Sequence, residues 1–164
     1  MLHKPSPKSS RVLARMLVAT FAIAFVQVCV AQAHEARRGD LTLRSSTVSS
    51  DRIDPATAAR HGIEPSATTA LLNVVLLRGS AQETVPAEVS ATARSLAGVR
   101  QEIGLREVRE NGRVSYLGGF DVLPREVMDL EVKAKPLHVE QSRTLVLRYR
   151  ERMWGIESKA GASR

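Results

Sequence analysis

Apolar and polar residues alternate with a period of two through most of the second half of the chain. In residues 85–94 the apolar side chains occupy every second position, and the same alternation recurs in residues 128–135 and, with Val146 as the exception, in residues 144–150. Asn111-Gly112 separates two further strand-like runs. Successive side chains of a strand point to opposite faces, so this pattern predicts half-buried strands, and an Asn-Gly pair between runs predicts a tight hairpin.

The spacing of these runs predicts the fold class. Turn residues separate six or seven short runs at intervals of roughly ten residues, and residues 70–77 are apolar on both faces, as in a central strand. One short helix is expected after Asp54, with Pro55 at its first position and Gly62 beyond its end. We therefore expect an all-β, immunoglobulin-like antiparallel β-sandwich of about seven strands with one short N-terminal helix.

Residues 1–33 have the features of a cleavable signal peptide. A basic segment precedes an apolar run over residues 16–30, and Ala31-Gln32-Ala33 supplies the small residues that signal peptidase requires. An uncleaved membrane anchor is the alternative, but the apolar run is short for a membrane span. We expect cleavage after Ala33 and a periplasmic location.

The charge of the mature chain argues against a nucleic-acid partner. The whole chain has a net charge of +7, but removing residues 1–33 leaves 20 basic against 17 acidic residues, a net charge of +3. That is an ordinary charge for a soluble domain. The single cysteine, Cys29, lies in the removed segment, so the mature chain is expected to have no thiol and no disulfide.

The remaining chain divides into three parts. Residues 34–50 are read as an N-terminal leader with a possible first strand at Leu41–Arg44, residues 51–154 as the sandwich, and residues 155–164 as a disordered tail.

Three blocks of residues resemble a known bacterial family. They comprise Ala58-Ala59-Arg60-His61-Gly62-Ile63 followed by Ala70–Val74, then Pro86–Ala93 with Leu96 and Gly98, and finally Leu105–Glu110 running into Tyr116–Val122. In order and spacing these blocks resemble domain-of-unknown-function family 4426. The resemblance implies an exported protein with one small β-domain, and it implies no activity or ligand.

His34 is the candidate metal ligand. Cleavage after Ala33 would make it the N-terminal residue, and its α-amine, with a pKa of about 7.7–8, could then chelate copper or zinc together with its imidazole. His138 or His61 would supply a further nitrogen. An incidental histidine at the new terminus is the competing interpretation.

The strand predicted at residues 145–153 carries the candidate protein-binding surface. Arg148, Arg150 and Arg152 alternate along it and share one face, which could bind an acidic partner. The competing interpretation is a solvated edge strand whose charges prevent aggregation.

The mature chain offers little for nucleophilic catalysis. It has no cysteine and no Gly-x-Ser-x-Gly sequence. We therefore predict a non-enzymatic periplasmic binding or interaction module. Its partner would be an envelope protein or a small ligand, without stable membrane insertion of the mature chain. The alternative is a copper or zinc carrier that uses the N-terminal histidine.

Overall fold

A computed structural model describes residues 33–137 and 143–154. Residues 1–32 of the predicted signal peptide, including Cys29, lie outside these ranges, as do the predicted tail and His138. No helix in the described ranges is long and apolar enough to cross a membrane.

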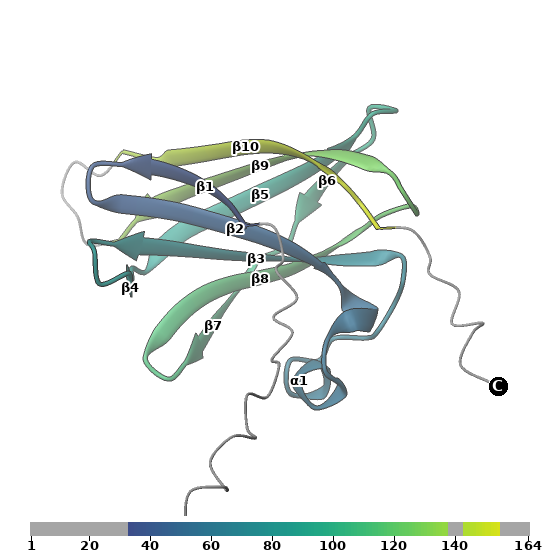
Figure 1. Cartoon of the computed structure of the whole chain (residues 1–164), viewed down its shortest axis with the longest axis horizontal. Helices are drawn as coiled ribbons and strands as arrows, with labels where there is room; N and C mark the ends of the chain where they lie inside the picture. Colours follow the sequence, from purple (N-terminus) through teal and green to yellow (C-terminus); the bar gives the residue numbers. More distant parts are fainter. Residues whose placement is uncertain (1–32, 138–142, 155–164) are drawn as a thin grey trace, which may run out of the picture.

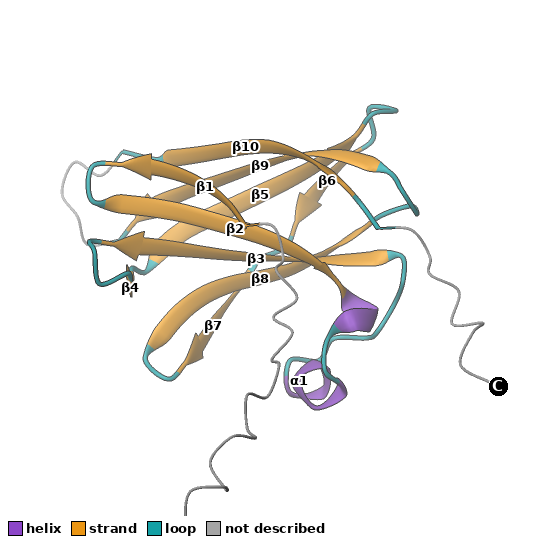
Figure 2. Cartoon of the chain, in the orientation of Figure 1, coloured by secondary structure: helices purple, strands orange, loops and turns teal. Residues whose placement is uncertain are grey.

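The described chain forms ten strands in two antiparallel sheets, with two short helices (Figures 1 and 2). In chain order the elements are β1 (Ala33–Arg38), β2 (Leu41–Ser49), η1 (Ser50–Arg52), α1 (Pro55–Arg60), β3 (Thr69–Arg78), β4 (Glu83–Thr84), β5 (Ala87–Ser95), β6 (Arg100–Ile103), β7 (Arg106–Glu110), β8 (Arg113–Asp121), β9 (Val127–Pro136) and β10 (Leu145–Arg152). The first sheet has the order β1-β2-β3-β8-β7, with β4 beside β3, and the second has the order β10-β9-β5-β6.

The two sheets pack face to face around one apolar core. Alternate residues of the central strands point inward, including Leu72 and Val74 of β3 and Leu130 and Val132 of β9. The expected all-β sandwich is therefore confirmed, with three more strands than expected. The immunoglobulin-like subtype stays a prediction.

Two local predictions are confirmed in detail. The Asp54 side chain accepts a hydrogen bond from the backbone N–H of Thr57 at 3.0 Å and caps α1, which begins at Pro55. Asn111 and Gly112 adopt φ angles of 49° and 74° between β7 and β8, as a two-residue hairpin turn with both residues left-handed requires.

The segment read as a leader belongs to the sandwich, which corrects the expected boundary at residue 51. Strand β1 pairs with β2 along its whole length, from Ala33 opposite Ser46 to Arg38 opposite Leu41. Only His34 and Ala36 of this strand are partly buried, so its inward face carries no large aliphatic residue. That is why the alternation of β1 is invisible in a search for apolar periodicity. The possible strand at Leu41–Arg44 is confirmed and continues to Ser49 as β2.

The chain crosses between the sheets after β6. Gly104 and Leu105 connect β6 in the second sheet to β7 in the first, and this connection passes close to the inner face of β8. A Cβ at Gly118 of β8 would lie 2.7 Å from the Gly104 carbonyl oxygen. A glycine at position 118 therefore provides the room for the crossing.

Candidate functional site

Five polar side chains line the interior where β1 and β2 approach β10. The inner face of β2 is polar after Leu43, because Ser45, Thr47 and Ser49 take the inward positions. Strand β1 lies next to β10 (Figure 1). We call this region the polar corner and define it by His34, Ser45, Thr47, Tyr149 and Glu151.

Four of these side chains approach one another across the two sheets, and Thr47 lies on the same inward face of β2 as Ser45. The His34 imidazole stacks on the Tyr149 ring, with centroids 3.9 Å apart and an interplanar angle of 14°. The Tyr149 and Ser45 hydroxyl oxygens are 2.9 Å apart and share a hydrogen bond. Burial raises the pKa of Tyr149 to about 12, although the bond to Ser45 opposes the shift. Tyr149 is therefore a neutral phenol that fixes the position of the His34 ring.

Three polar atoms of the corner lack a hydrogen-bond partner. His34 Nε2, Thr47 Oγ1 and Glu151 Oε2 are shielded from solvent, and within the described chain they are the only such side-chain atoms without a partner. His34 Nε2 and Glu151 Oε2 face each other at 4.0 Å, too far apart for a direct hydrogen bond. Because buried polar atoms in folded proteins are almost always bonded, the facing pair calls for a bridging water molecule or ion between His34 and Glu151.

The structure does not bring His34 and His61 together. His61 ends α1, and its Nε2 lies 3.2 Å from Glu110 Oε1 of β7. Strands β1 and β7 are opposite edges of one sheet, so four strand spacings, roughly 19 Å, separate them. His138 lies outside the described residues. Within the described ranges, no three His, Cys, Asp or Glu side chains gather closely enough to hold a metal ion by themselves.

Sequence reasoning identified one member of the corner and missed four. Ser45, Thr47, Tyr149 and Glu151 look like ordinary strand residues, because β2 and β10 are distant in sequence. The available signal was the run Ser45-x-Thr47-x-Ser49, which places hydroxyls where an inward strand face normally carries aliphatic residues.

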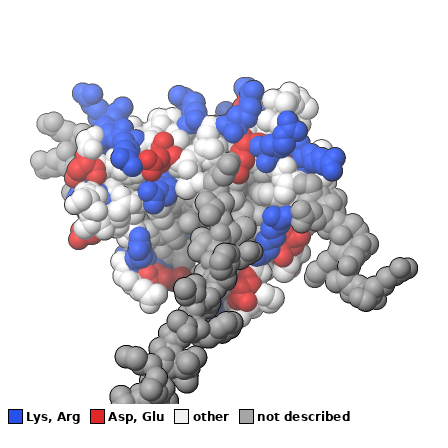
Figure 3. Space-filling view, in the orientation of Figure 1, with Lys and Arg blue, Asp and Glu red and all other residues white. Residues whose placement is uncertain are grey.

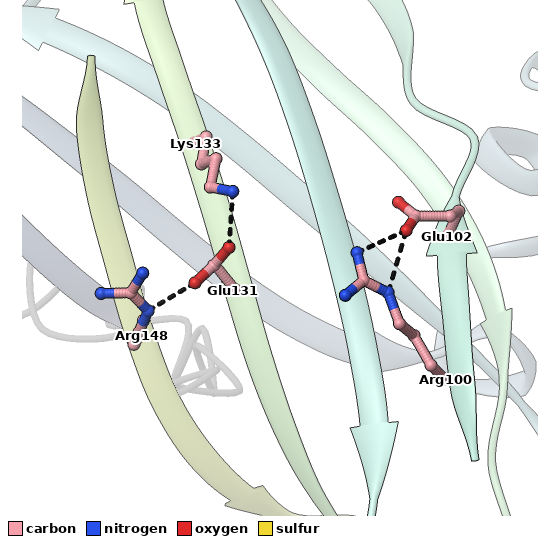
Figure 4. Close-up of polar contacts among 5 residues, drawn as sticks. All are labelled: Arg100, Glu102, Glu131, Lys133 and Arg148. Atoms are coloured by element: carbon pink, nitrogen blue, oxygen red, sulfur yellow. Dashed lines mark hydrogen bonds and ion pairs between the residues drawn. The ribbon is translucent and has the colours of Figure 1, made fainter. Parts of the chain in front are cut away.

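The three predicted arginines lie on the outer face of the second sheet. Arg150 makes two hydrogen bonds to Asp129, at 2.7 and 2.9 Å, and Arg148 pairs with Glu131. Glu131 also lies 2.8 Å from Lys133 (Figure 4). Arg152 is exposed at the end of β10.

These ion pairs hold two carboxyl groups in their charged form. The hydrogen bond from Arg150 lowers the pKa of Asp129, and those from Lys133 and then Arg148 lower the pKa of Glu131. Two of the three predicted arginines are therefore already paired with acidic side chains.

The same face contains a surface hollow that the sequence did not predict. It has a volume of about 640 Å³, and its lining includes Arg94 of β5 and Arg100 of β6 beside Arg148 and Arg150. Arg100 pairs with Glu102 at 2.6 Å (Figure 4). The hollow thus gathers arginines from three strands, together with the carboxylates of Asp129 and Glu131 that pair with two of them.

Comparison with known proteins identifies a family and a fold. A family model described as "Domain of unknown function (DUF4426)" matches residues 35–154. The chain is similar to the crystal structure of a DUF4426 family protein from Pseudomonas aeruginosa, with 22% identity and a TM-score of 0.66, covering 76% of this chain and 97% of that one.

Two structures of FetP from uropathogenic Escherichia coli share the fold more distantly. One is a copper-bound variant, with 12% identity and a TM-score of 0.57, covering 82% of this chain and 98% of that one. The other is FetP as isolated, with 10% identity and a TM-score of 0.51, covering 73% and 94%. No curated protein matches the chain.

Proposed function

This chain belongs to the DUF4426 family, whose function is unknown, so a role has to be argued from its own polar corner. We propose that the protein is an exported, non-enzymatic periplasmic domain that binds a copper or zinc ion between His34 and Glu151. The two facing atoms are shielded from solvent, so the site suits an ion better than a substrate.

The spacing of the two facing atoms carries this proposal. Bonds from zinc to histidine nitrogen and to carboxylate oxygen are about 2.0–2.2 Å long. Two such bonds in line span the 4.0 Å between His34 Nε2 and Glu151 Oε2. An ion between them would therefore contact both atoms without a large movement of either side chain.

The chemistry of the donors narrows the class of metal. Imidazole nitrogen suits copper and zinc, and a carboxylate supplies the negative charge that balances a divalent ion. Stacking on Tyr149 holds the imidazole in place, as partners of metal-binding histidines commonly do. The copper-bound state of FetP makes copper the first metal to test, and at 12% identity it transfers no residue to this chain.

This binding mode differs from the chelate expected from the sequence. A terminal α-amine chelates metal together with Nδ1 of the same histidine, because those two atoms close a six-membered ring with the ion. Nε2, on the far side of the imidazole, is the atom that faces Glu151. The geometry thus favours a His34–Glu151 site that does not need a free α-amine.

Metal titration with thermal unfolding tests the proposal. We expect stoichiometric copper to raise the melting temperature of the wild type. The control variant His61→Ala, which removes a histidine from the separate contact with Glu110, should show the same rise. A ligand at one hundred times its Kd stabilises the folded state by about 2.7 kcal/mol. His34→Ala and Glu151→Gln should lose the shift.

Two versions of the protein separate the two binding modes. One begins at His34, and the other retains Ala33. The His34–Glu151 site predicts equal copper binding by both, whereas the α-amine chelate predicts loss of binding when Ala33 is present. A copper shift that survives in both His34→Ala and Glu151→Gln would rule out the corner.

A second candidate function is the binding of an acidic partner in the arginine-lined hollow. Arg94 lies beside Arg100 in the register of β5 and β6 and opposite Asp129 of β9, which already pairs with Arg150. Arg94→Glu should weaken such binding, while Lys135→Glu, farther along the same face, should change it less. An acidic peptide measured at low and high salt is the suitable probe.

A further inference from the structure

Three large aliphatic side chains are exposed at one end of the sandwich. Leu96 and Val99, in the β5–β6 hairpin, are 64% and 60% exposed, and Leu123, in the β8–β9 loop, is 65% exposed. The other strongly exposed aliphatic residues, Leu137 (42%) and Val146 (36%), lie near the ends of β9 and β10 that face the opposite way. The most exposed aliphatic residues are therefore concentrated in two loops at the same end.

The two loops are joined across the sheets. The Gln101 side-chain amide donates to the Asp121 carbonyl oxygen at 2.9 Å, and the Asp121 N–H donates back to the Gln101 side chain at 3.0 Å. Val99 lies two residues before Gln101, and Leu123 lies two residues after Asp121. Both loops thus project from one fixed base at the end of the sandwich.

The β5–β6 hairpin is a tight projection. The Ser95 N–H donates to the Val99 carbonyl oxygen at 2.9 Å, and the Gly98 N–H donates to the Ser95 carbonyl oxygen, also at 2.9 Å. Gly98 adopts a φ of 88°, which allows the reversal of the chain. The hairpin therefore presents Leu96 to solvent from a closed turn.

Arginines stand behind these aliphatic tips. Arg94 and Arg100 are the last paired residues before the hairpin turn, Arg125 shares the loop of Leu123, and Arg152 lies opposite Val127 at the start of β9. Arg94, Arg125 and Arg152 are exposed, and Arg94 lies opposite Asp129 of β9. Figure 3 shows an uncharged projection at the upper right with Lys and Arg side chains next to it.

We propose that this end of the sandwich docks on the surface of an anionic phospholipid bilayer. Leu96, Val99 and Leu123 would enter the boundary between headgroups and acyl chains, and the arginines would bind lipid phosphates. Aliphatic tips backed by cations match the layered chemistry of a membrane surface.

A protein partner fits this end less well. Protein interfaces are centred on aromatic side chains set in well-packed patches. The strongly exposed large hydrophobic residues of the described chain are all aliphatic, and at this end they stand on two separate projections. This proposal is independent of the metal site, which lies between β1, β2 and β10.

Vesicle binding tests the proposal. Protein that begins at Ala33, the first residue of β1, is sedimented with vesicles of pure phosphatidylcholine or of phosphatidylcholine mixed with phosphatidylglycerol. We expect at least roughly tenfold tighter binding to the anionic vesicles, since each basic residue near such a surface contributes about 1 kcal/mol. Trp154 is the only tryptophan in the sequence, and its carbonyl oxygen accepts a hydrogen bond from the Arg125 N–H in the loop of Leu123. Because Trp154 lies next to this loop, a change in its fluorescence gives a second measure of vesicle binding.

Variants at the tips decide whether these loops make the contact. Leu96→Ser combined with Leu123→Ser should weaken binding by roughly tenfold or more, whereas Leu137→Ser at the opposite end should leave it unchanged. All three positions are exposed, and unchanged melting temperatures would verify folding. Equal binding to both vesicle types, or no loss in the Leu96/Leu123 variant, would overturn the proposal. Crosslinking of position 96 to an envelope protein, without vesicle binding, would instead assign this end to a protein partner.

Discussion

Replacing Gly118 with alanine tests how the chain crosses between the two sheets. The added Cβ would lie 2.7 Å from the Gly104 carbonyl oxygen and 2.8 Å from Ile103 Cγ2. Carbon atoms normally approach each other to about 3.5–4.0 Å. The connection between β6 and β7 would therefore have to move by several tenths of an ångström, and the Gly104 backbone cannot rotate away as a flexible side chain would.

Two opposing terms set the size of the effect. Overpacking of a well-packed core typically costs about 1–3 kcal/mol of stability. We expect Gly118→Ala to fall in the upper half of this range, because the nearest atom belongs to the backbone of Gly104 and cannot move aside easily. Replacing glycine also restricts the unfolded chain, which returns about 0.4–1 kcal/mol. We expect a net loss in the free energy of unfolding of about 2 kcal/mol.

The next residue supplies a matched control. A Cβ at Gly119 points to the outer face and would lie 3.6 Å from Thr69 Cγ2, an ordinary contact. Neither glycine has a positive φ, so alanine fits the backbone at both positions. Gly119→Ala should therefore leave the stability unchanged or raise it slightly.

Urea unfolding measures both variants. With a slope of about 1–3 kcal/mol per molar, Gly118→Ala should lower the midpoint by roughly 1 M, and the slope should stay constant. A Gly118→Ala midpoint equal to that of the wild type would refute the argument from close approach. An equal drop in Gly119→Ala would show that β8 tolerates no substitution in this region, whatever the distance to the crossing.

Three further predictions concern single side chains. Folding raises the pKa of Tyr149 from 10.0 to about 12. The neutral phenol therefore contributes its full share to the stability of the folded state below pH 10, and this contribution is lost as the pH rises from 10 to 12. In urea unfolding across this range, the free energy of unfolding of the wild type should fall by about 2–3 kcal/mol, whereas that of Tyr149→Phe should not show this fall. Parallel pH profiles of the two proteins would contradict the raised pKa. Thr47→Val removes a buried hydroxyl without a partner and should stabilise the metal-free protein by about 1 kcal/mol, measured by thermal unfolding; a loss of stability would show that this hydroxyl is bonded. Asp54→Ala removes the cap on Thr57 and should cost about 1 kcal/mol in urea, whereas Asp54→Asn, which keeps an acceptor, should cost less.

The strands were predictable where one face is aliphatic. Residues 85–94 and 128–135 alternate clearly, residues 144–150 alternate apart from Val146, and each run falls in or overlaps a strand of the second sheet. The helix was predictable because Asp54 and Pro55 mark its start chemically. In these cases the local sequence and the tertiary environment favour the same structure.

Strand β1 and the polar corner were not predictable for related physical reasons. Strand β1 turns only His34 and Ala36 inward, and its stability comes from backbone pairing with β2 rather than from an apolar face. The corner depends on which strands become neighbours across the sandwich. A strand's own pattern of residues does not specify that choice, so Glu151 could not be assigned as the partner of His34.

The contact between Ser45 and Tyr149 also has a consequence for the order of folding, since 104 residues separate them in sequence. A polypeptide that threads through a narrow channel with its N-terminus first delivers β1 and β2 long before β10. Until the last strand emerges, His34 has neither Tyr149 to stack on nor Glu151 to face. In the exported protein that we propose, completion of the corner would therefore coincide with the end of translocation, and the proposed metal ion would be acquired only in the compartment where the whole chain has arrived.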